Sequence, residues 1–102
     1  MRLEFEDDEL RRLAAGEIQD VKRWPPAVTK MFHRRIQFLA GAADDRDLRA
    51  MKSLHLEQLK GNRWRGHSSI RLDQQYRLIL RFYTDSQGRV TVIVDGLDYH
   101  KG

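Results

Sequence analysis

The chain has 102 residues, of which 40% are hydrophobic and 33% charged, and a formal net charge of +4. This length predicts a single domain over residues 1–102 with one hydrophobic core, and the composition excludes a disordered chain. The absence of cysteine excludes disulfides and thiolate metal sites, and no apolar run approaches the roughly 20 residues of a membrane helix. The acidic start is unlike a signal peptide, so we expect a cytoplasmic protein with no membrane contact.

The positive charge is concentrated in the middle of the sequence. Residues 49–81 carry eight Lys and Arg against two acids, whereas residues 1–48 carry nine against ten and residues 82–102 two against three. Such segregation is typical of one surface that binds an anion, and a chain of phosphates is the commonest such partner.

The first residues predict a strand followed by a helix. Leu3 and Phe5 alternate with polar residues, which is the period of a short, half-buried strand at the edge of a sheet. Asp7 or Asp8 can then cap a helix with Leu10, Leu13 and Ala14 at helical spacing, and Gly16 leaves open whether the helix reaches Ile18.

A second, longer helix follows a break at two prolines. Pro26 suits the first position of this helix, and Gly41 lies where it should weaken. Its inward residues are expected to be Val28, Met31, Phe32, Ile36, Leu39 and Ala43. Residues 44–50 can add a short turn with Leu48 inward, and residues 51–68 predict a loop anchored by leucines.

Three alternating runs, over residues 70–72, 76–82 and 90–94, predict an antiparallel meander, with Gly96 breaking the last strand. A three-residue hairpin loop at 73–75 would set Arg71 opposite Arg77. Parity then places both on the sheet face that points away from the helices, together with Arg81. Two opposed guanidinium groups repel each other unless an anion lies over them.

These residues suit the cleavage of RNA without a metal. That reaction needs a base for the 2′-hydroxyl, cations for the charged phosphorane and an acid for the departing 5′-oxygen. Lys60 and Arg77 are candidate charge carriers, His100 and Tyr99 candidate proton carriers, and Glu57 a candidate base. Each is also a common surface residue, so the residue types alone predict only an RNA-binding α+β domain.

Other chemistries lack their motifs. The four histidines do not have the spacing of a metal site, so we expect neither a metal nor a cofactor. No glycine-rich phosphate loop of the Walker type and no G-x-S-x-G elbow is present.

Four motifs, in this order, resemble the HigB family of toxins, also called plasmid maintenance killer proteins, in the RelE/ParE toxin superfamily. The motifs are LEQLKGNR from Leu56, SIR from Ser69, DQQYR from Asp73 and DYH from Asp98. The segment at Trp24 with its following helix is also similar, so the resemblance covers nearly the whole chain.

The resemblance implies an α+β fold of the RelE type, with two N-terminal helices packed on a small antiparallel sheet and a C-terminal catalytic tail. It also implies the toxin of a type II toxin–antitoxin system, acting as an endoribonuclease on mRNA in the decoding site of the 70S ribosome. The implied partner that neutralises it is a HigA-type helix-turn-helix antitoxin.

Carried onto the matching positions, the resemblance assigns roles to single residues. Lys60 and Arg77 would stabilise the phosphate, and Asp98, Tyr99 and His100 would form the catalytic end. Some members have histidine where this chain has Glu57, and His55 lies two residues earlier. The general base and the general acid therefore stay open among Glu57, Asp98, Tyr99 and His100. The remaining candidates for RNA contact are His55, Arg63, Arg65, Arg71 and Arg81.

Two alternatives remain from the sequence. A module of the same fold could bind RNA, the ribosome or an antitoxin without cutting, because the basic face alone suffices for that. A purely structural partner of a transcription factor is also conceivable, but it leaves the terminal Asp-Tyr-His motif without a role.

Overall fold

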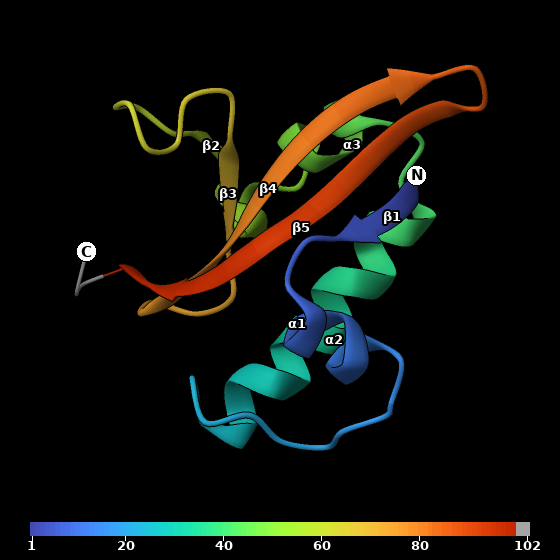
Figure 1. Ribbon diagram of the computed structural model, residues 1–102. Helices are drawn as coiled ribbons and strands as arrows, with labels where there is room; N and C mark the ends of the chain where they lie inside the picture. Colours follow the sequence, from blue (N-terminus) through green and yellow to red (C-terminus); the bar gives the residue numbers. More distant parts are fainter. Residues whose placement is uncertain (100–102) are drawn as a thin grey trace.

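The computed structural model describes residues 1–99 and shows helices packed on a strongly twisted sheet (Figure 1). The elements in chain order are β1 (Arg2–Phe5), α1 (Asp8–Ala14), α2 (Pro26–Gly41), α3 (Asp45–Ala50), the 3-10 helix η1 (Lys52–Leu54), β2 (Glu57–Gln58), β3 (Ser68–Arg71), β4 (Tyr76–Asp85) and β5 (Gly88–Asp98).

The sheet has the strand order β1-β5-β4-β3-β2 and is mixed. The meander of β3, β4 and β5 is antiparallel, as predicted, and β2 extends it with two residues. The edge strand β1 is also as predicted. It pairs with β5 in parallel, however, so the prediction of an antiparallel sheet was wrong for this strand. Most of the chain lies between β1 and β5 and supplies the crossover that a parallel pair requires.

Gly96 does not end the last strand as predicted, because β5 continues to Asp98. The six-membered ring of Trp24 lies against Gly96, where a Cβ atom would come within 2.8 Å of its Cη2 atom and closer still to Cζ3. A glycine inside a strand often marks such a close approach. Two residues earlier, Val94 is the extra residue of a β-bulge, since Ile79 pairs with Asp95 and Leu80 with Ile93.

Helix α1 begins as predicted, and it ends before Gly16, where the sequence left its end open. The carboxylate of its N-cap, Asp7, accepts a hydrogen bond of 2.9 Å from the backbone N–H of Leu10. The helix stops at Ala14, and Gly16 follows with a φ of +76°, so Ile18 lies outside it. The left-handed conformation of this glycine, two residues past the helix, explains why the helix stops before Ile18.

Helix α2 matches the prediction at both ends, from Pro26 to Gly41. Val28, Phe32 and Leu39 are buried, while Ala43 lies past the end of the helix and is exposed. Helix α3 is the predicted short turn, and its Leu48 is fully buried.

The core lies between the helices and one face of the sheet. Trp24, only 4% exposed, packs against Phe32 and Tyr76 with ring centroids 5.8 and 6.1 Å apart, and its indole N–H donates to the hydroxyl of Thr29 at 3.0 Å. Beside it, Arg23 forms ion pairs with carboxylates of α1 and β5, including Asp95 at 3.1 Å. The segment before α2 therefore ties the helices to β5.

No helix in residues 1–99 combines the length and apolar character needed to cross a membrane.

Gly96→Ala should lower the free energy of unfolding by about 1–3 kcal/mol, because the new methyl group would collide with the packed ring of Trp24. Urea unfolding measures this change. Gly41→Ala is the matched control, since nothing lies within 4 Å of the added carbon, and we expect it to leave stability unchanged or slightly raised. Equal effects of the two substitutions would contradict a special role for the contact with Trp24.

Candidate functional site

Arg77 on β4 is the buried cation among residues 1–99, with 4% of the residue exposed. Its partner across the ladder is Arg71, as predicted. Its Nε donates to the hydroxyl of Ser69 at 2.8 Å, and its Nη2 donates to the carbonyl of His55 at 2.6 Å. The carboxylate of Glu57 lies 3.5 Å from the same Nη2. Three neighbouring elements therefore fix the orientation of this guanidinium group.

His55 is the non-glycine residue with a positive φ among those described, at +48°. This left-handed conformation follows η1 and turns the carbonyl toward Arg77, while the imidazole Nε2 lies 3.3 Å from Nη1 of Arg71. The two opposed arginines thus contact different groups of one residue. Their acceptors within the protein reduce the repulsion that the sequence predicted between them.

Arg77 stays charged although it is buried. Burial lowers the pKa of Arg77 from its ordinary value, whereas the nearby Glu57 and Tyr99 act in the opposite direction. An arginine begins from a pKa so high that it remains a cation at neutral pH. The site therefore holds a fixed positive charge at low exposure, where its interaction with an anion is less weakened by water.

Arg77 borders a hollow of about 410 Å³ on the sheet face that points away from the helices. Five side chains of its lining are hydrophobic and three are charged. The lining residues are Leu59, Arg63, Trp64, Arg77, Ile79, Leu97, Asp98 and Tyr99. They come from β4, from the end of β5 and from the loop between β2 and β3, which lie at the same end of the molecule (Figure 1).

The hairpin loop before β4 holds the C-terminal part of the site. Asp73 accepts hydrogen bonds from the backbone N–H groups of Gln75 and Tyr76 at 2.8 and 2.7 Å, which shapes the loop. The carbonyl of Gln75 then accepts from the N–H of Tyr99 at 2.7 Å, and its side-chain amide donates to Asp98 at 2.8 Å. The ring centroid of Tyr99 lies 5.2 Å from the guanidinium carbon of Arg77.

The predicted site residues differ in where the structure places them. Arg63, Arg77, Asp98 and Tyr99 line the hollow, and Glu57, His55 and Arg71 connect to it through the contacts described above. Lys60 and Arg65 are exposed on the loop and do not line the hollow. Arg81 shares the outer face but forms an ion pair of 3.0 Å with Glu6. His100 lies outside the described residues.

The sequence reasoning missed the hydrophobic wall of the hollow. Trp64 stands between two arginines, an interleaving of aromatic and basic residues that is typical of nucleic-acid binding and could have been noticed. Ile79 lies on the outward face between Arg77 and Arg81, yet it is only 4% exposed. Because Ile79 alternates with two arginines on the outward face of β4, its apolar side chain could have indicated that another part of the chain covers this face.

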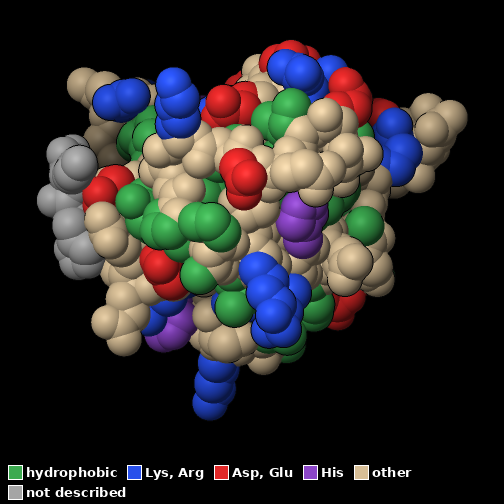
Figure 2. Space-filling view, turned by 90° about the horizontal axis from the view of Figure 1, so that it is seen from below, with side chains coloured by type: hydrophobic (Ala, Val, Ile, Leu, Met, Phe, Trp, Pro, Cys, Tyr) green, Lys and Arg blue, Asp and Glu red, His purple; other side chains and the backbone are tan. Residues whose placement is uncertain are grey.

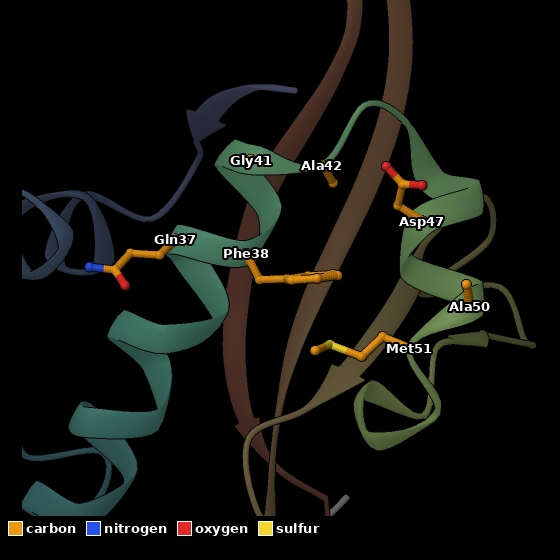
Figure 3. Close-up of a pocket in the computed structure, with 7 residues that line it drawn as sticks. All are labelled: Gln37, Phe38, Gly41, Ala42, Asp47, Ala50 and Met51. Carbon is orange, nitrogen blue, oxygen red and sulfur yellow. The ribbon is translucent and has the colours of Figure 1, made fainter.

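Another hollow, of about 550 Å³, lies between the end of α2 and α3. Figure 3 shows Phe38 and Met51 pointing into it from the two sides. Its one charged residue is Asp47, so it offers no cation to a phosphate.

On the face in Figure 2, Lys and Arg side chains lie in separate groups with acidic and hydrophobic side chains between them. Among residues 1–99, no three His, Asp or Glu side chains are grouped to hold a metal ion.

Comparison with known proteins shows the family of the chain. Residues 3–100 match the family of HigB-like toxins, described as "RelE-like toxin of type II toxin-antitoxin system HigB". Toxin HigB-1 of Vibrio cholerae is 34% identical over 85 residues, which are 80% of this chain and 84% of the relative.

Solved structures share the fold. The YoeB/ParE toxin from Agrobacterium tumefaciens has a TM-score of 0.58 at 14% identity, covering 97% of this chain and 99% of that one. YafQ from E. coli has a TM-score of 0.57 at 13% identity, covering 99% and 97%. At these identities the likeness concerns the fold alone, and it confirms the expected α+β architecture.

Ser69→Ala should destabilise the protein by about 1–3 kcal/mol, because it removes the acceptor of a buried, charged donor, Nε of Arg77. The shift of the urea unfolding midpoint measures the effect. Ser68→Ala is the control on the same strand, since Ser68 is half-buried and lines a different hollow. We expect the control to change stability by less than about 0.5 kcal/mol. Similar midpoints for both variants would show that the contact with Arg77 contributes nothing.

Proposed function

Because the chain belongs to the HigB-like toxins of type II toxin–antitoxin systems, we propose that it is a ribosome-dependent endoribonuclease that cleaves mRNA and so inhibits translation. One observation carries the proposal. The guanidinium group of Arg77 is fixed at the edge of a hollow that Asp98 and Tyr99 also line. A fixed cation beside groups able to move protons is what attack by the 2′-hydroxyl on a phosphodiester needs.

In this mechanism Arg77 stabilises the charge that develops on the phosphorane. Its Nε and Nη2 are held by protein acceptors, while within residues 1–99 no protein acceptor meets Nη1. We infer that the phosphate approaches from the side of Nη1. Because the group is already oriented, little reorganisation is needed during the reaction.

We propose that proton transfer is carried out by Glu57 and by residues at the C-terminal end of the chain. We propose that the base comes from Glu57, Asp98, Tyr99 or His100, and that a second member of this set protonates the departing 5′-oxygen. Tyr99, which is 51% exposed and lies over Arg77, can reach a bound nucleotide. The step needs no metal, since the attacking oxygen is supplied by the RNA itself.

The ribosome is proposed to complete the site. Lys60 is exposed and must turn toward the hollow to contact the phosphate, and Arg77 presents little of its surface. A site with these two features is a weak catalyst by itself. Binding at the decoding site would order the mRNA and the loop together, in the cytoplasm, where translation takes place.

The same features favour a second candidate, a module that grips RNA or the ribosome without cutting. The exposed cations Lys60, Arg63 and Arg65 suffice for such binding, which would weaken steeply as salt rises.

Expression of the wild-type protein should stop growth and create new mRNA 5′ ends that depend on active translation. Arg77→Lys, which keeps the charge but loses the planar fork, and His100→Ala should each reduce cleavage by about 100-fold or more and restore growth. Arg46→Ala is the control, because Arg46 is exposed on α3 and pairs only with Asp44 among the described residues, and it should stay toxic. Growth arrest without new 5′ ends would contradict cleavage and favour the binding module. Continued cutting by both site variants would remove these residues from the mechanism.

An antitoxin of the HigA type is the proposed partner. We expect the flanking DNA to encode a small helix-turn-helix protein whose co-expression restores growth and which purifies with the toxin. Measured growth rates with and without that protein test this prediction. Persistent arrest in cells that accumulate the folded helix-turn-helix protein would exclude it as the antitoxin.

A further inference from the structure

The hollow beside Arg77 is more hydrophobic than a phosphate requires. Its charged edge is formed by Arg63, Arg77 and Asp98, whereas its hydrophobic wall consists of Leu59, Trp64, Ile79, Leu97 and Tyr99. A phosphate is recognised by the arginines alone, and an apolar wall adds nothing to its binding. A ligand that matches both parts has an anion joined to a flat apolar ring, as a nucleotide does.

Trp64 is the largest side chain of this wall, and the loop that carries it is closed at its base. The N–H of Leu59 donates to the carbonyl of His67 at 2.9 Å, and the N–H of His67 donates to the carbonyl of Trp64 at 3.0 Å. The His67 ring meets the indole at a centroid distance of 5.4 Å and an angle of 70°. These contacts hold a half-buried indole at the border of the hollow.

Arg63 adds a cation to the same surface. Its guanidinium carbon lies 4.9 Å from the centroid of the Trp64 ring. A guanidinium over an indole is attracted by the ring's negative face, and it can exchange with, or lie beside, another flat group. Stacking of unpaired bases on aromatic side chains next to cations is the common physical basis of single-strand binding.

We propose that Trp64 is a stacking platform for the nucleobase next to the phosphate held by Arg77, which makes it a determinant of RNA preference. This inference rests on the proposed function, since it takes the bound phosphate to belong to single-stranded RNA. Purines are favoured over pyrimidines because two fused rings cover more of the indole than one does. The preference is moderate, because stacking reads the area of a base rather than its hydrogen-bonding edge.

A purely structural role predicts something different. In that case Trp64 only covers Ile79, and any large apolar side chain would replace it. Trp64→Leu and Trp64→Phe separate the two roles, because leucine keeps the apolar cover and phenylalanine also keeps a flat aromatic face. Stacking predicts that the leucine variant loses RNA affinity while the phenylalanine variant retains part of it.

Fluorescence gives a direct reading of the contact. The chain has two tryptophans, and Trp24 is buried in the core at 4% exposure. A base that stacks on Trp64 should therefore quench the fluorescence of that indole alone. We propose titrations at low salt with oligoadenylate and oligouridylate of about eight nucleotides, a length within the usual range for single-strand sites.

Oligoadenylate should quench the wild-type protein and bind more tightly than oligouridylate. Trp64→Leu should weaken the binding of labelled oligoadenylate by about 5- to 150-fold, as followed by anisotropy, and Trp64→Phe by less. Arg65→Ala is the control, because Arg65 is exposed on the same loop and does not line the hollow. It should weaken both RNAs equally and reduce the dependence on salt.

The inference is wrong if neither RNA quenches the fluorescence at low salt, or if the leucine and phenylalanine variants bind alike. Near-ultraviolet circular dichroism checks that both variants are folded. The test also separates this inference from the proposed nuclease. Quenching of the wild-type protein by oligoadenylate, weaker binding of labelled oligoadenylate by Trp64→Leu, and an absence of new mRNA 5′ ends in cells would together support the platform and overturn the nuclease. New 5′ ends whose number and base preference are unchanged in Trp64→Leu would support the nuclease and contradict the role of Trp64 as a platform.

Discussion

The site depends on the hydrogen bonds that hold the buried guanidinium group of Arg77. An unpaired charge is costly to remove from water, so the surrounding chain has to supply acceptors. Ser69 on β3 and the carbonyl of His55 supply them, and the left-handed backbone of His55 is the local conformation that turns this carbonyl inward. The same contacts that make the burial tolerable also fix the direction in which the cation faces. Stability and orientation of the site therefore have one origin.

The opposite side of the sheet positions the other half of the site. Trp24 packs against Gly96, and Arg23 pairs with Asp95, so the segment before α2 holds the last part of β5. Asp98 and Tyr99 follow directly and are fastened to the hairpin loop at Gln75. The packing of Trp24 on the helical face of the sheet therefore helps to position Asp98 and Tyr99, which line the hollow on the opposite face.

The charge of the middle segment does not become one continuous basic surface. Arg81 is paired with Glu6, Arg77 lies near Glu57, and Arg71 contacts His55. The exposed cations Lys60, Arg63 and Arg65 are on the loop that carries Trp64, whereas Arg49 and Lys52 are exposed on α3 and η1. An aromatic side chain among exposed cations, beside a buried one, suits a flexible polyanion with flat bases better than an isolated phosphate.

The sequence by itself determined the α+β class, the limits of α2, the opposition of Arg71 and Arg77, and the family, because periodicity, proline placement and motif order are local properties. It also indicated Arg63, Arg77, Asp98 and Tyr99, which the fold brings to one hollow. Only the tertiary structure decided that β1 joins β5 in parallel, that Gly96 lies inside a strand, and that Trp64 and Ile79 form the wall of the site. Each of these depends on contacts between residues far apart in the chain, and no local pattern encodes which distant side chain will fill the space beside a glycine or over a strand.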